Sequence, residues 1–140
     1  MRCLPSHVRN PQANRGATVV EFAIVAPLFF LLLFAAMEFA IAGTIRSTAN
    51  NAAYEAARLI VVPGATNQEG VDEATRIMSI VGVNNLTVNV TPPVIDKDTS
   101  EVTVDIAIPY SQNAYFMPWF MGNVTIQSTY TLNTERSDGS

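Results

Sequence analysis

The sequence has very few of the side chains that nucleophilic and metal-dependent enzymes use. It contains one cysteine, Cys3, one histidine, His7, and one lysine, Lys97. Because Cys3 and His7 both lie near the start, the rest of the chain lacks the residues for a Cys-His pair, a Ser-His-Asp triad or the usual zinc site. A single cysteine also excludes a disulfide within the chain. We therefore expect no enzymatic activity, no metal and no cofactor.

Two groups of acidic residues remain as candidates for acid-base chemistry or cation binding. Asp72 and Glu73 fall in a segment expected to be helical, where they would be solvated. Asp96, Asp98 and Ser100 offer oxygen ligands at alternate positions and Glu101 follows them, but the glycine of a true calcium loop is missing from this segment. We interpret both groups as polar surface, and calcium binding at 96–101 stays open as an alternative.

Positive charge is scarce and unevenly placed. The net charge is −4, yet the first sixteen residues hold three arginines, Arg2, Arg9 and Arg15, and no acid. Basic residues are retained preferentially on the cytoplasmic side of a membrane, so this pattern predicts a cytoplasmic N-terminus and an exported, acidic C-terminal part. No cluster of basic residues is present that would bind nucleic acid.

One long apolar run dominates the N-terminal third. No residue from Phe22 to Met37 is charged, and the wider segment 17–45 is long enough to cross a bilayer, which requires about 20 mostly apolar residues. Glu21 and Glu38 interrupt it 17 positions apart, about 26 Å along a helix, so each is expected near a headgroup boundary. Pro27 removes one helical hydrogen bond and is expected to bend the helix or to be accommodated without effect.

The helix is predicted to continue beyond the apolar run as an amphipathic segment. Apolar residues recur there at helical spacing, namely Ile45, Ala49, Ala52, Ala53, Ala56 and Ile60. Pro63 and Gly64 are expected to end it, which gives a rod of about 45 residues and about 70 Å. The alanine-rich stripe is expected to pack against the protein's own sheet, with packing against another subunit as the alternative.

The remainder predicts a small α+β head over residues 46–134, followed by a frayed tail at 135–140. A second helix is expected from Glu69 to Val81, ending at Gly82. Strands are expected at Leu86–Thr91, Val102–Ile108 and Val124–Leu132, forming a three-stranded antiparallel sheet. The inward residues of the last two strands are predicted to be Val102, Val104, Ile106 and Ile108, and Val124, Ile126, Tyr130 and Leu132.

Several short motifs together resemble the TadE-like family of minor pseudopilins, which belong to the tight-adherence machinery that builds Flp-type pili in bacteria. The resemblance extends from Arg15 to about Val62. The residues that carry it are Arg15-Gly16, Val20-Glu21-Phe22-Ala23, Pro27 and Ala52-Ala53-Tyr54-Glu55-Ala56-Ala57-Arg58.

The resemblance implies a structural role in pilus assembly. A prepilin peptidase is expected to cut between Gly16 and Ala17, removing residues 1–16 and leaving 17–45 as a transmembrane assembly helix in the bacterial inner membrane. Glu21 is expected to pair with the new N-terminus of a neighbouring subunit. The expected partners are the peptidase, other pilins or pseudopilins, the inner-membrane assembly platform and membrane lipid, and no small-molecule substrate is expected.

Two other interpretations use the same residues. Ala40-Ile41-Ala42 fits a secretory signal peptidase site, and cleavage there would release a soluble periplasmic binding domain beginning at Gly43. An unprocessed single-pass adaptor of a secretion apparatus is the third possibility.

The segment from Ala114 to Met121 is expected either to plug the open end of the head's core or to form a partner patch, through Tyr115, Phe116, Trp119 and Phe120.

Overall fold

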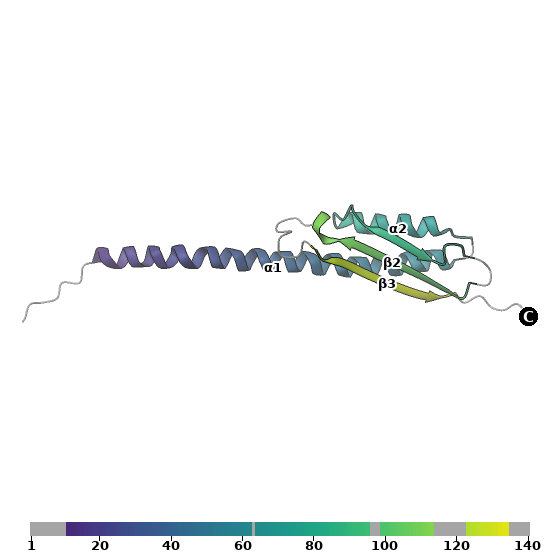
Figure 1. Cartoon of the computed structure of the whole chain (residues 1–140), viewed down its shortest axis with the longest axis horizontal. Coiled ribbons are helices and arrows are strands. Elements are labelled where there is room, and N and C mark those ends of the chain that lie inside the picture. The colour runs from purple at the N-terminus through teal and green to yellow at the C-terminus, as the bar shows by residue number, and fades with distance from the viewer. Residues whose placement is uncertain (1–10, 63, 96–98, 114–122, 135–140) are drawn as a thin grey trace, which may run out of the picture.

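The computed structural model describes residues 11–62, 64–95, 99–113 and 123–134, with the backbone alone described for residues 11–15. One very long helix, α1 (Pro11–Val61), carries a small head made of a second helix and a three-stranded sheet (Figure 1). The head contains α2 (Asn67–Ile80), β1 (Thr87–Thr91), β2 (Glu101–Pro109), the short helix η1 (Tyr110–Gln112) and β3 (Thr125–Asn133). The predicted α+β fold is confirmed.

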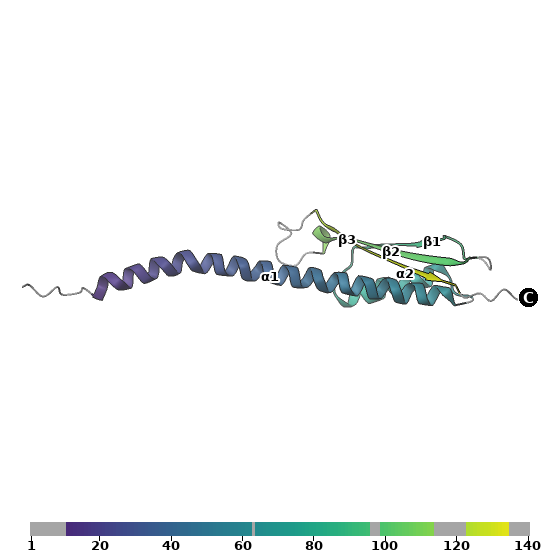
Figure 2. The same ribbon diagram turned by 90° about the horizontal axis from the view of Figure 1, so that it is seen from below.

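Helix α1 runs without a break from the apolar segment into the head. Its N-terminal half projects away from the head and is curved, and the only proline inside the helix is Pro27 (Figure 2). Loss of the proline's hydrogen bond accounts for such bending. The helix starts at Pro11, a residue suited to a first turn, so it includes Gly16 and Ala17. It is thus longer than the 45-residue rod expected from the sequence, at 51 residues.

The head has two layers, with the sheet on one side and both helices on the other (Figure 2). The strands form an antiparallel meander in the order β1-β2-β3. Helix α1 lies under β2 and β3, whereas α2 lies beside α1 and contacts β1. The sheet therefore covers both helices together, so the long helix is part of the head's core.

Buried apolar residues alternate with partly covered residues along β2, and the buried ones form the sheet's part of the core. Val102, Val104, Ile106 and Ile108 are all buried, as predicted, while the residues between them are only partly covered. The predicted alanine-rich stripe of α1 is also fully buried, and Ala42 and Ala57 extend it. Small side chains let the sheet approach the helix axis closely, so the stripe packs within the chain, as expected.

Helix α2 begins two residues earlier than expected because of a capping box. The hydroxyl of Thr66 accepts from the backbone N–H of Glu69, and the Glu69 carboxylate accepts from the N–H of Thr66. This reciprocal pair satisfies two donors that a helix start otherwise leaves unpaired. Gly82 follows the helix with a φ of 77°, a left-handed conformation that favours glycine.

The prediction for β3 was wrong at two of its four inward positions. Val124 precedes the strand and is 42% exposed, and Tyr130 is 36% exposed, where its ring packs edge-on against Tyr54 at 5.1 Å. The buried residue that the pattern missed is Ser128, whose hydroxyl donates to Asn50 Oδ1 of α1 at 2.7 Å. A polar pair thus replaces an apolar contact between β3 and the long helix.

Helices α1 and α2 approach each other closely at Gly70. A Cβ atom at this position would lie 2.1 Å from Ile60 Cδ1, 2.5 Å from Ile60 Cγ1 and 3.4 Å from the carbonyl oxygen of Ala56. Ile60 is itself buried against α2. The absence of a side chain at residue 70 therefore sets the distance between α1 and α2.

Gly70→Ala should destabilise the head. Overpacking a core costs about 1–3 kcal/mol, while alanine in a helix regains about 1 kcal/mol, so the net loss should be about 1 kcal/mol. Thermal unfolding of the full chain in detergent would measure it. Ile60→Val supplies the control in a double-mutant cycle, because it removes the nearest methyl group. Equal effects of Gly70→Ala in both backgrounds would contradict the proposed steric cause.

Candidate functional site

The N-terminal half of α1 presents apolar side chains on every face. Its most apolar stretch has a mean hydropathy of 2.5, none of it is buried in the head, and α1 has the length and composition to cross a membrane. Large side chains that are more than half exposed include Val19, Val20, Phe22, Ile24, Val25, Leu28, Phe29, Phe30 and Leu32. An apolar surface of this extent requires cover by lipid or by other helices.

The residues of the predicted cleavage site lie in the exposed first part of this helix. Packing does not require glycine at position 16, because a Cβ atom there would meet nothing within 4 Å, and its φ is not positive. Ala17 is exposed as well. The backbone at this site is helical, so a peptidase that binds an extended substrate would first have to unwind the helix end, which frays most easily.

Glu21 is a charged group on an otherwise apolar surface. Its side chain is exposed between Val20 and Phe22, and it makes no ion pair with any other residue that the structure describes. A carboxylate inside a bilayer costs several kcal/mol and is usually paired. The structure leaves this side chain available to a group outside the chain.

Glu38 has a different environment from the one that its sequence position suggested. It is only 2% exposed, although Met37 and Phe39 on either side are exposed. Its Oε1 accepts a hydrogen bond of 2.6 Å from the hydroxyl of Tyr110, a residue 72 positions away in η1. Glu38 was expected only to lie near a headgroup boundary. Instead, its hydrogen bond to Tyr110 joins α1 to η1 of the head.

The second oxygen of Glu38, Oε2, is buried without a hydrogen-bond partner among the described residues. The sequence did contain a signal for this position. Glu38 lies four residues before Ala42 and seven before Ile45, so it continues the buried stripe by one turn. The predicted stripe began at Ile45 and therefore missed both Glu38 and Ala42.

Tyr110 is held in place by the backbone around it. Its N–H donates to the carbonyl of Val124, and it is fully buried. The neighbouring Asn113 is buried too, and its amide group bonds Asn84, Asn85 and the carbonyl of Pro109. Burial, followed by the hydrogen bond to Glu38 and the nearby carboxyl charge, raises the pKa of Tyr110 well above its usual value. The phenol therefore stays protonated and remains a donor.

An open cleft of about 420 Å³ lies beside this junction, between α1 and the start of β3. One wall consists of α1 residues and the other of the segment 124–127. The lining residues are Phe39, Ala42, Gly43, Arg46, Val124, Thr125, Ile126 and Gln127. Sequence patterns did not reveal this cleft, because its walls come from segments about 80 positions apart.

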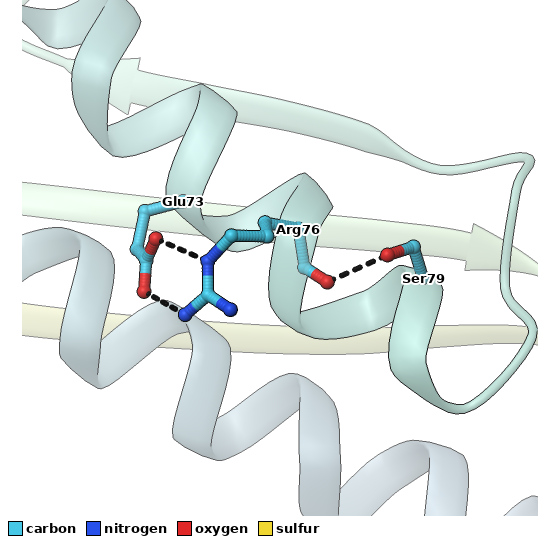
Figure 3. A network of polar contacts seen from close by, with 3 residues as sticks. All are labelled: Glu73, Arg76 and Ser79. Atoms are coloured by element: carbon cyan, nitrogen blue, oxygen red, sulfur yellow. Dashed lines mark hydrogen bonds and ion pairs between the residues drawn. The ribbon is translucent and has the colours of Figure 1, made fainter.

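The remaining acidic candidates have structural partners or lie outside the described residues. Glu73 pairs with Arg76 at 2.6 Å on the surface of α2, and Ser79 donates to the Arg76 carbonyl (Figure 3). The hydrogen bond from Arg76 lowers the pKa of Glu73. Asp72 accepts from Gln68. In the described parts of the chain no three metal-ligating side chains come together.

The calcium alternative at 96–101 depends on residues 96–98, which lie outside the described ranges. The same holds for the predicted patch residues Tyr115, Phe116, Trp119 and Phe120. Both remain predictions.

Tyr110→Phe should destabilise the head by about 2–3 kcal/mol, because it removes the hydrogen-bond donor that the buried carboxyl group of Glu38 has among the described residues. Thermal unfolding of the full chain in detergent would show the loss. Tyr130→Phe is the matched control, since Tyr130 is partly exposed and lies in the second half of β3, away from Glu38. Adding Glu38→Leu to Tyr110→Phe should restore much of the stability, because no unpaired carboxyl group is then buried. If the double variant is no more stable than Tyr110→Phe, the buried hydrogen bond between Tyr110 and Glu38 is not the cause of the loss.

A comparison with models of protein families gives a match to the first part of the chain. The model of the family described as TadE-like protein matches residues 16–58, which is the exposed part of α1 together with most of its buried stripe. Comparisons with curated proteins and with solved structures found no match. TadE-like proteins are associated with tight-adherence pilus systems and are of a structural, non-enzymatic kind. The resemblance carried by Gly16, Glu21, Pro27 and the alanine-rich segment is therefore confirmed: residues 16–58 of this chain are TadE-like.

Proposed function

We propose that this protein is a minor pseudopilin that takes part in assembling a Flp-type, tight-adherence pilus. In this proposal α1 anchors it in the bacterial inner membrane with the N-terminus in the cytoplasm and the head outside. A prepilin peptidase removes residues 1–16, and the processed helix then associates with other pilins. The observation that carries the proposal is the TadE-like match over a helix whose most apolar stretch is not buried by any part of the chain that the structure describes.

The surroundings of Gly16 support processing at this position. Neither packing nor backbone conformation explains a glycine there, and glycine weakens a helix by about 1 kcal/mol relative to alanine. A residue that folding does not need is accounted for by recognition at the cleavage site. Three arginines before it fit a leader retained in the cytoplasm.

The structure also bears on the rival cleavage after Ala42. Ala42 is buried under β3 within an unbroken helix, and cleavage there would remove Glu38, the partner of Tyr110. The released domain would lose a buried polar contact and one turn of the core stripe. The unprocessed adaptor keeps these contacts, so processing distinguishes it from the pseudopilin.

Gly16→Leu should block processing while leaving the fold intact. A side chain at residue 16 enters open space, and leucine is a good helix former. Intact mass spectrometry of protein from peptidase-positive cells should show a chain beginning at Ala17 for the wild type and the full-length chain for the variant. A wild-type chain beginning at Gly43 or still carrying Met1 would overturn the proposed processing.

Glu21→Ala should insert into the membrane normally yet fail to enter filaments, because the new N-terminus of a neighbouring subunit would lose its carboxylate partner. The amount of protein in sheared filaments, divided by the amount in the membrane fraction, would measure incorporation. Glu101→Ala removes the same charge from an exposed position in the head and serves as the control. Unchanged incorporation of Glu21→Ala would rule out the pairing role.

A further inference from the structure

The cleft beside α1 combines apolar walls with one basic residue. Phe39 is 64% exposed and Val124 is 42% exposed, so the head leaves two large apolar side chains uncovered on opposite walls. Gly43 lines the helical wall one turn after Phe39, and a Cβ atom there would meet nothing within 4 Å, so the space beside residue 43 is open. A volume of about 420 Å³ lies within the usual range for ligand sites.

The helical wall of the cleft continues directly into the apolar half of α1. Residues spaced by three or four positions share one face of a helix. The face that includes the cleft runs through Leu28, Leu32, Ala35, Phe39, Ala42 and Arg46. Leu28 and Leu32 are 60% and 61% exposed. A hydrocarbon chain lying on this face would therefore meet apolar side chains from the span up to the cleft.

Arg46 lies at the height where a lipid headgroup would be. It follows Met37, the last residue of the uncharged run, by nine positions, which is about 13 Å of helix. Side chains on a helix lean toward its N-terminus, so the guanidinium group reaches back toward the membrane side. Arg46 is exposed and makes no ion pair within the described ranges, unlike Arg76. Guanidinium groups bind phosphate through paired hydrogen bonds.

We propose that this cleft binds one anionic phospholipid of the surrounding bilayer, with its phosphate on Arg46 and an acyl chain along Phe39 and Leu32. This inference rests on the proposed membrane anchoring of α1. The lipid would cover the exposed apolar side chains of the cleft, at the end of the head that is nearest the apolar half of α1. It would also hold the base of the head at the membrane surface.

Native mass spectrometry of the full chain in a neutral detergent, titrated with phosphatidylglycerol or phosphatidylcholine, would test the site. The wild type should bind one phosphatidylglycerol about five-fold more tightly than phosphatidylcholine, the preference expected from one cation near an anionic headgroup. Arg46→Gln should abolish this preference. Arg58→Gln removes an exposed arginine 12 positions further along the same helix and should leave it unchanged. Gly43→Leu, which fills the cleft, should weaken binding of both lipids.

Equal effects of Arg46→Gln and Arg58→Gln would show a general response to charge and overturn the proposal, as would a wild type with no preference. Dimerisation that is lost in Gly43→Leu without any bound lipid would assign the cleft to a second copy of the chain instead. Fractionation of cells distinguishes failure of the lipid site from failure of the proposed membrane anchoring. If the wild type is absent from the membrane, the anchoring is wrong; if it is present without lipid preference, only the lipid site is wrong.

Discussion

The structure depends on one helix that serves two environments. The C-terminal half of α1 supplies the buried alanine-rich face on which β2 and β3 rest. The most apolar stretch of its N-terminal half is not buried by any part of the chain that the structure describes. Because the helix is unbroken, the sheet cannot reorient independently of the apolar half. Packing in the head therefore fixes which faces of the apolar half point toward neighbours. A subunit that associates through this helix would present its head in one defined orientation.

The contact between Glu38 and Tyr110 marks the transition between the two environments. Met37 and Phe39 are exposed, whereas Glu38 is buried against a tyrosine that the backbone of Val124 holds in place. A buried polar contact contributes little net stability but penalises any arrangement that breaks it. A rotation of the head around α1 would leave the carboxyl group buried and unpaired. The contact thus specifies the orientation of the head more than it strengthens the core.

The fold was largely predictable because its main elements carry local periodicity. The alternation in β2, the stripe from Ile45 to Ile60 and the helix over α2 were all visible in the sequence. Features that arise between distant segments were not. The hydrogen bond of the buried Ser128 to Asn50 joins residues 78 positions apart, and the need for glycine at residue 70 comes from Ile60, which lies opposite. At the candidate site, motif resemblance indicated Gly16 and Glu21, but the cleft and the burial of Glu38 depend on how β3 and η1 meet α1.

The two glycines of α1 differ from the other described glycines in having no structural cause. Gly64 and Gly82 have positive φ values, and Gly70 admits a neighbouring helix. Gly16 and Gly43 are helical and exposed, with open space around them, and each weakens the helix slightly. They lie at the two ends of the apolar span. If folding does not require them, contacts outside the chain account for their presence. The contacts that we propose are a peptidase at Gly16 and a lipid at Gly43.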